Sequence, residues 1–217
     1  MRHGGAASAN VDLQGLLKAY LKPMVFCAGL APLIYLIWQV VLLSCGNTAN
    51  LGADPAKAIV LFNGDWALRF MLLTLAVSPL RMVTGWAQLA RLRRMLGLFA
   101  FTYGILHFSA YVALLLEFRF GDLGEELIER PFITVGFLAL LGLLPLALTS
   151  NRYMIGKLKR RWQLLHRLVF PVAVLQIVHL FWLTRSDYTE PLMYSAALSL
   201  LIAYRITKRQ RRRLSSG

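Results

Sequence analysis

The chain has 217 residues, of which 58% are hydrophobic and only 16% are charged, and its formal net charge is +14. A soluble domain of this size carries more charge and less apolar surface, so the composition indicates a membrane protein. Such a positive charge would suggest nucleic-acid binding if it lay on one surface of a soluble domain. Here the cations lie between apolar blocks. They predict a basic surface beside anionic lipid, with the lipid bilayer as a partner and no nucleic acid.

The N-terminal region carries few features of its own. Residues 1–20 lack an apolar core and a small-residue cleavage site, so we expect no signal peptide and a short cytoplasmic tail.

The chain has two cysteines, Cys27 and Cys45, which are too few for a disulfide framework or a thiolate metal site. No Cys-x-x-Cys-His string occurs, which excludes the covalent attachment used by c-type cytochromes.

Six apolar segments are long enough to cross a hydrocarbon core as helices, for which about 20 residues are needed. They cover 22–44, 65–86, 95–117, 132–150, 163–184 and 191–206. The dyad alternation of a membrane β-barrel is missing from them. We therefore predict an all-α membrane protein, a six-transmembrane-helix bundle over residues 21–206 with a basic cytoplasmic tail at 207–217. No internal repeat or separate soluble domain is visible.

The connections between the predicted spans are alternately basic and acidic. The cations gather in the N-terminal region, in 81–94, in 152–167 and in the C-terminal tail, whereas the other connections hold nearly all the acids. Because cytoplasmic loops are enriched in Lys and Arg, both termini are expected on the cytoplasmic side. The acidic connections then face the opposite side of the membrane.

Three of the four histidines lie within apolar segments, while His3 belongs to the polar N-terminal tail. Ionisable side chains are rare in membrane spans unless they face the bundle interior with a partner. For one such residue, a neutral imidazole bonded to a neighbouring helix would be an adequate explanation. Here three such histidines lie on only two spans, which favours a functional role over three separate structural ones. They are His107, His166 and His179.

The spacing of these histidines suggests metal ligation. His166 and His179 are thirteen residues apart on one predicted helix, about 20 Å along its axis, and cannot share a metal ion. His107 and His179 both belong to the outer halves of spans that run in the same direction. Neutral imidazole is a common axial ligand of heme iron, and two of them favour electron transfer over substrate binding. We therefore predict a b-type heme between His107 and His179.

His166 has no histidine opposite it, because Arg94 stands thirteen residues before His107. Several roles stay open: ligation of a second heme, binding of a quinone headgroup, proton transfer, or a local hydrogen bond. The neighbouring arginines, Arg91, Arg93 and Arg94, present guanidinium groups that suit heme propionates or a flavin phosphate. Such a basic run also simply enforces membrane topology.

Four segments resemble the MsrQ (YedZ) family, within the ferric-reductase-like transmembrane superfamily. They are GDWALRFMLLTLAVSPLR at 64–81, RRMLGLFAFTYGILHFSAY at 93–111, RPFITVGFLALLGLLPLALTSNR at 130–152 and KRRWQLLHRLVFPVAVLQIVH at 159–179. The resemblance covers nearly the whole chain except its two ends.

The resemblance implies a multi-pass heme protein of the bacterial inner membrane. Members of this family take electrons from the quinone pool and pass them to MsrP, a periplasmic molybdopterin enzyme that reduces methionine sulfoxide in oxidised proteins. The heme-associated histidines of the family correspond to His107, His166 and His179, and a bound FMN is also implied. The chain departs from the superfamily pattern at Arg94, where a fourth histidine often stands, and by lacking a nucleotide-binding domain after the sixth span.

Two other functions compete with this one. A stand-alone ferric or flavin reductase of the same fold would use the same heme without a periplasmic partner. A transporter or channel would use the histidines as a proton relay, but the spans hold almost no central acids, which usually mark ion pathways.

Overall fold

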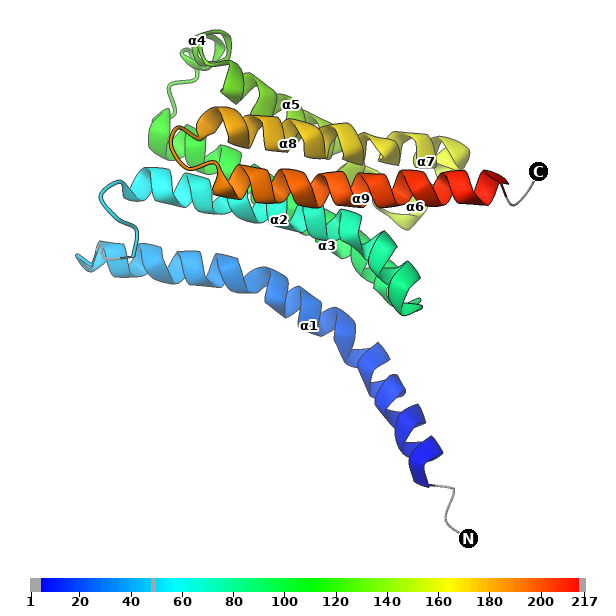
Figure 1. Ribbon diagram of the computed structural model, residues 1–217. Coiled ribbons are helices and arrows are strands. Elements are labelled where there is room, and N and C mark those ends of the chain that lie inside the picture. Colours follow the sequence, from blue (N-terminus) through cyan, green and yellow to red (C-terminus); the bar gives the residue numbers. More distant parts are fainter. Residues whose placement is uncertain (1–4, 48–49, 215–217) are drawn as a thin grey trace.

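The computed structural model describes residues 5–47 and 50–214, and every regular element in these ranges is helical (Figure 1). This confirms the predicted all-α class. The long elements are α1 (Gly5–Ser44), α2 (Pro55–Thr84), α3 (Leu89–Ala110), α5 (Pro131–Leu148), α8 (Val169–Leu183) and α9 (Thr189–Leu214). The short elements are the π-turn η1 (Tyr111–Leu115), α4 (Leu123–Glu129), α6 (Arg152–Leu158), α7 (Arg160–Leu165) and the 3₁₀ turn η2 (His166–Leu168).

Five helical segments of the described chain are long and apolar enough to cross a membrane. They are Tyr20–Ser44, Pro55–Thr84, Leu89–Leu115, Pro131–Leu148 and Arg160–Leu183. Each overlaps one of the first five predicted spans. A helix also forms over the predicted sixth segment, but α9 runs on into the basic C-terminal residues and does not satisfy the same criterion, so a sixth span stays a prediction.

The two predicted tails are helical where they are described. Helix α1 already begins at Gly5, and α9 continues to Leu214. His3 lies outside the described residues.

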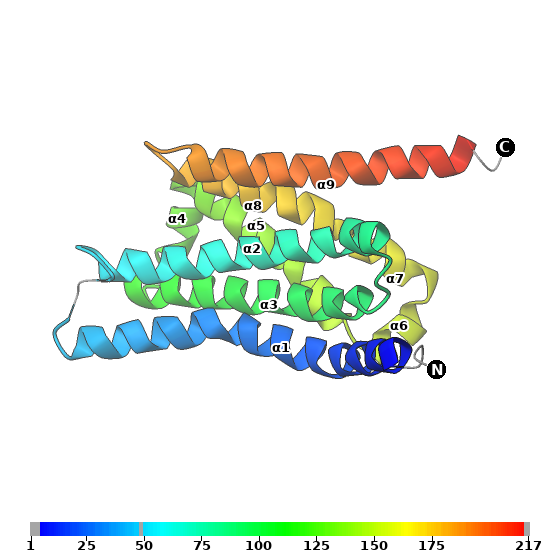
Figure 2. The same cartoon turned by 60° about the horizontal axis from the view of Figure 1, so that its bottom comes forward.

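The bundle is assembled from two helical hairpins. Helix α2 packs along α3, α5 packs along α8, and α9 lies against α2 and α8 (Figure 2). Small and branched side chains such as Ala100, Leu143 and Ala173 fill the interior. Apolar side chains also cover the outside, where Ile34 and Leu200 are well exposed, as expected for helices that face lipid.

Helix α1 lies outside the hairpins against α3, and Tyr103 of α3 interrupts its hydrogen-bond ladder near Pro32. The Leu33 N–H donates to the Tyr103 hydroxyl over 3.1 Å, and this hydroxyl donates to the Gly29 carbonyl over 2.9 Å. The phenol thus bridges a backbone donor and a backbone acceptor that stand four residues apart in α1. An inserted side chain is a recognised cause of helix bending, and α1 is visibly bent in Figure 1.

We expect Tyr103→Phe to destabilise the attachment of α1, because the two hydrogen bonds that tie α3 to α1 are lost, at about 0.5–1.5 kcal/mol each. The readout is the thermal unfolding temperature of the purified protein in detergent. Tyr35→Phe is the matched control, since the Tyr35 side chain is 50% exposed. Equal unfolding temperatures for the two variants would contradict the bridging role of Tyr103.

The fifth predicted span is a broken helix. Lys159 has a positive φ of 47° and separates α6 from α7, and the 3₁₀ turn η2 separates α7 from α8. His166 is the first residue of this 3₁₀ turn, and His179 lies in α8.

Candidate functional site

His107 of α3 and His179 of α8 face each other across the interface between the two hairpins. Their ring centroids are 6.1 Å apart and their ring planes are inclined by 83°. The structure therefore brings together the two histidines that the sequence paired by depth.

Each of these imidazoles is held by a main-chain carbonyl of the other helix in its hairpin. His107 Nδ1 donates to Val60 O over 2.8 Å, and His179 Nδ1 donates to Phe132 O over 2.6 Å. A carbonyl oxygen can only accept a hydrogen bond, so the proton resides on Nδ1 and the Nε2 lone pair is left for another partner. Metal-ligating histidines are typically oriented in this way.

A glycine beside each ring makes room for it. A Cβ on Gly64 would lie 2.9 Å from His107 Nδ1, and a Cβ on Gly136 would lie 2.8 Å from His179 Nδ1. Contacts this short do not occur in folded proteins, so a larger residue at either position would displace the imidazole.

The two half-sites repeat one another. The carbonyl residue precedes its histidine by 47 residues in both cases, and the glycine follows the carbonyl residue by one helical turn. This correspondence in the structure was not predicted from the sequence, where no internal repeat is visible. The repeat comprises a few positions on two helix pairs of otherwise different sequence, too few to be visible as sequence similarity.

The paired imidazoles suit one metal ion bound between them. With a metal–nitrogen bond of about 2 Å on either side, the centroids of two opposed imidazoles lie about 6 Å apart. No group of three or more His, Cys, Asp or Glu that could hold a metal ion occurs among the described residues. A metal at this position therefore needs further ligands from a non-protein group, and the four nitrogens of a porphyrin would supply them.

His166 lies in a second environment, at the opposite end of the same hairpin. Trp162 stacks on it with ring centroids 3.9 Å apart, and its Nδ1 lies 3.2 Å from Trp162 O. Its Nε2 is buried and has no hydrogen-bond partner. A buried nitrogen left in this state indicates a ligand that the protein chain does not itself provide.

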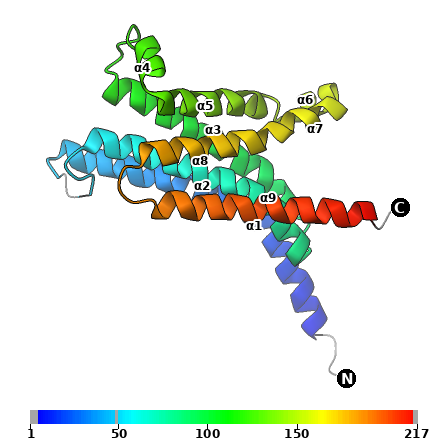
Figure 3. The ribbon, with the colours of Figure 1, turned by 45° about the horizontal axis from the view of Figure 1, so that its top comes forward.

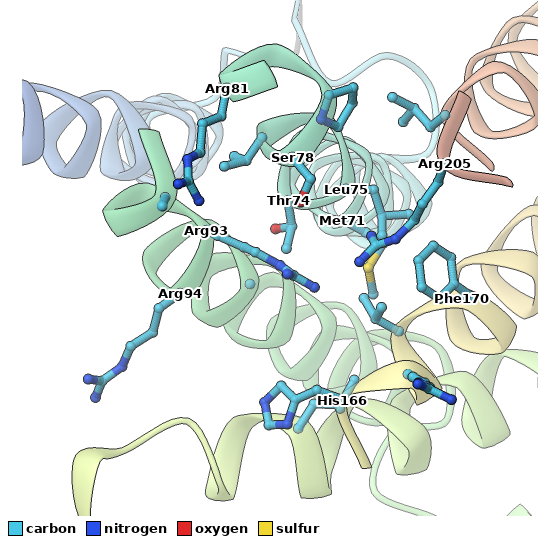
Figure 4. A pocket seen from close by; sticks show the side chains of 18 of the residues that line it. Met71, Thr74, Leu75, Ser78, Arg81, Arg93, Arg94, His166, Phe170 and Arg205 are labelled. Carbon is cyan, nitrogen blue, oxygen red and sulfur yellow. The ribbon is translucent and has the colours of Figure 1, made fainter. Parts of the chain in front are cut away.

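A cavity of about 1190 Å³ adjoins His166 and is lined by cations (Figure 4). Its described lining contains no Asp or Glu, but it contains Arg81, Arg93, Arg94, Arg167, Arg205 and Lys208. Cations gathered without carboxylates favour the binding of an anion, and guanidinium groups pair well with carboxylate or phosphate oxygens.

Arg93 and Arg94 occupy different positions around this cavity. The Arg93 side chain is half-buried and extends into the cavity toward Arg205, whereas Arg94 is exposed and points away (Figure 4). The Arg205 guanidinium lies 4.9 Å from the centre of the Phe170 ring. Arg93 and Arg205, rather than the predicted Arg94, are thus the guanidinium groups best placed to meet an anion inside the cavity.

Sequence reasoning missed the carbonyls of Val60 and Phe132 and the two glycines. A signal for the glycines was present, because Gly64 precedes His107 by the same number of residues as Gly136 precedes His179. The carbonyls have no such signal, since every residue carries one.

Comparison with known proteins shows the family of the chain. Residues 63–177 match the family described as ferric reductase like transmembrane component. The chain is 45% identical over 188 residues to the protein-methionine-sulfoxide reductase heme-binding subunit MsrQ of Xanthomonas euvesicatoria pv. vesicatoria (strain 85-10), covering 87% of this chain and 86% of the relative. It is 40% identical over 208 residues to the MsrQ subunit of Polaromonas naphthalenivorans (strain CJ2), covering 93% and 92%.

No solved structure shows significant similarity to the chain. The family assignment therefore rests on the sequence matches, which extend over most of the length of both chains. Its multiple apolar helices and its match to a transmembrane family identify a multi-pass membrane protein. The chain belongs to the MsrQ family of ferric-reductase-like transmembrane proteins.

Proposed function

We propose that this protein is the membrane electron-transfer subunit of a methionine sulfoxide reductase system, with a heme b held between His107 and His179. Electrons enter from the quinone pool and leave to a periplasmic molybdopterin reductase of the MsrP type, which repairs oxidised proteins. The observation that carries this proposal is the opposed pair of imidazoles, 6.1 Å apart, with both Nδ1 atoms bonded to carbonyls.

The residues at this site favour electron transfer over substrate chemistry. A heme held by both histidines would supply one-electron transfer and would leave neither imidazole free to bind substrate. His107 and His179 come from separate hairpins, and the bonds to Val60 O and Phe132 O fix the orientations of their rings. Imidazoles held in this way would limit structural rearrangement around the bound group. The protein itself carries out no sulfoxide reduction in this scheme.

We further propose a second heme in the cavity beside His166. The buried, unpartnered Nε2 of His166 supports an axial ligand role, and the cavity of about 1190 Å³ is large enough for a porphyrin. Arg93 and Arg205 would hold its two carboxylates, and Arg94 would contribute positive charge from the rim. The same cavity is also the candidate site for a quinone headgroup or for FMN. FMN binding stays a prediction from the family resemblance.

The proposed orientation places both termini in the cytoplasm and counts α9 as the sixth span of a domain over residues 21–206. The described ends of the chain, in α1 and α9, lie toward the same end of the bundle (Figure 1). The basic cavity lies toward this end, whereas His107 and His179 lie toward the other. The positive-inside rule then directs electrons outward, from the inner face of a bacterial inner membrane to its periplasmic face.

Reconstitution tests this function directly. The purified protein is placed in proteoliposomes with a quinol and the periplasmic molybdopterin reductase, and the heme spectrum is followed. We expect the quinol to reduce the heme, and the reductase with methionine sulfoxide to reoxidise it. The His179→Leu variant, which lacks one proposed ligand, is the control and should transfer no electrons.

Three outcomes would contradict parts of the scheme. Reduction by reduced flavin but not by quinol would replace the proposed donor. Rapid reoxidation by chelated ferric iron, without any by the molybdopterin reductase, would identify a stand-alone ferric reductase. A purified protein without heme would revive the transporter hypothesis. Flavin analysis of the same sample tests for FMN.

A further inference from the structure

The segment between η1 and α5 exposes an unusual group of apolar side chains. Phe118 and Phe120 are each 63% exposed with their rings 6.3 Å apart, and Ile128 on α4 is 83% exposed. Figure 3 shows α4 standing off from the bundle at the end of α5. We call these three residues, together with Glu117, Glu125 and Glu129, the α4 patch.

The α4 patch carries uncompensated negative charge. The two arginines of the segment are already paired, Arg119 with Asp122 at 3.6 Å and Arg130 with Glu126 at 3.1 Å. Within the described chain, the three glutamates of the patch take part in no ion pair. The segment between η1 and α5 therefore displays exposed apolar side chains and unpaired carboxylates together, on an otherwise basic protein.

A cavity of about 490 Å³ lies between η1 and α4. Its lining includes Tyr111, Glu125 and Glu129, together with the two ion pairs Arg119–Asp122 and Arg130–Glu126. Glu125 and Glu129 are one turn apart on α4, so both carboxylates project on the same face. A lysine or arginine entering this cavity would meet both of them.

Direct contacts connect the α4 patch to the paired imidazoles. Tyr111, one turn after His107, donates its hydroxyl proton to Glu126 of α4 over 3.0 Å. Thr134 of α5 donates to the Leu127 carbonyl, and the neighbouring Phe132 carbonyl holds His179. The patch thus lies on a short segment bonded to both helices that position the proposed outer heme.

We propose that the α4 patch is the docking surface for the electron acceptor, a soluble protein with a positively charged rim around an apolar centre. This rests on the proposed function, which requires an acceptor on this side. Anionic lipid headgroups would repel the three free glutamates, which favours a protein partner over the membrane surface. A patch of this size suits the small, transient interfaces of redox partners.

Charge reversal tests the electrostatic part of this proposal. In the reconstituted system we expect Glu117→Lys/Glu125→Lys/Glu129→Lys to lower the second-order rate of heme reoxidation by the molybdopterin reductase at least about tenfold at low salt. The loss should shrink as the ionic strength rises. Reduction of the heme by quinol, and the heme content, should remain at the wild-type level.

A matched single substitution controls for the change in net charge. Asp187 lies on another loop at the same end, and bonds from the Thr189 hydroxyl and N–H lower its pKa, which favours the charged carboxylate. Glu125→Lys should slow reoxidation more than Asp187→Lys. Equal effects, or none from the triple substitution while the wild type is reoxidised normally, would overturn the docking surface. A wild type that the reductase never reoxidises would instead overturn the proposed acceptor.

Ile128→Trp distinguishes a protein partner from lipid. We expect its fluorescence to shift to shorter wavelength only when the reductase is added to protein in anionic nanodiscs. A shift that is already complete without the reductase would place the patch in the bilayer interface and overturn the proposal.

Discussion

His107→Leu and His179→Leu should each abolish the spectrum of the outer heme. Either substitution removes one of two axial ligands and leaves an apolar side chain that cannot replace it. Loss of a residue that merely orients a metal ligand already costs about 10–100-fold in affinity, so loss of the ligand itself should cost at least about 100-fold. Heme per polypeptide, measured as the pyridine hemochrome, gives the result.

His166→Leu is the internal comparison for these two variants. It should leave the spectrum of the His107 and His179 heme intact and remove only the second heme, so the total should fall to about half of the wild type. Wild-type heme content in both His107→Leu and His179→Leu would exclude the assignment of the axial ligands.

Gly136→Ala and Gly64→Ala should weaken the outer heme although neither touches a ligand atom. Alanine is favoured over glycine in a helix by about 1 kcal/mol, so the change would normally stabilise the protein. Here the new Cβ would lie 2.8 Å from His179 Nδ1 or 2.9 Å from His107 Nδ1 and would push the ring from its carbonyl. We expect heme transfer to apomyoglobin to become at least about tenfold faster.

Gly156→Ala provides the control for the glycine variants. An added Cβ on Gly156, in α6, would meet no atom within 4 Å. This variant should therefore keep wild-type heme retention and gain slightly in thermal stability. If Gly136→Ala behaves in the same way, the close approach of helix and imidazole has no part in holding the heme.

Depth along the spans was sufficient to pair His107 with His179, because parallel helices of similar tilt bring residues of equal depth together. The same reasoning placed Arg94 opposite His166. It considered only depth, and not the direction in which each side chain leaves the helix. Arg94 lies thirteen residues from His107, about 140° away around the helix, whereas Arg93, at fourteen residues, is within about 40°. Arg93 accordingly extends into the cavity, and Arg94 points away (Figure 4).

The break at His166 could not be predicted from hydropathy. The predicted span at 163–184 carries one continuous apolar stretch through α8 and no proline or glycine immediately around His166, so a uniform helix was the simplest expectation. The 3₁₀ turn at His166–Leu168 advances by about 120° per residue instead of 100°, which changes the direction of the His166 side chain relative to His179. Apolar composition gives the length of a membrane segment, but not its local winding, which also depends on contacts such as the bond that Trp162 Nε1 donates to the Thr149 carbonyl over 3.0 Å.

The insertion of Tyr103 into α1 was also outside the reach of sequence patterns. Pro32 favours a bend in α1, because a proline removes one backbone donor. It could not indicate that a phenol from a helix some 70 residues away accepts from Leu33 and donates to Gly29.

The repeated half-sites have a consequence for the biogenesis of the protein. Each hairpin brings one histidine, one carbonyl and one glycine, so neither hairpin can retain heme before the other has been synthesised and inserted. A ligand that binds only the assembled form stabilises that form by mass action. Heme supply would then act as a checkpoint after translation, and chains made under heme starvation would remain as two loosely associated hairpins open to membrane proteases.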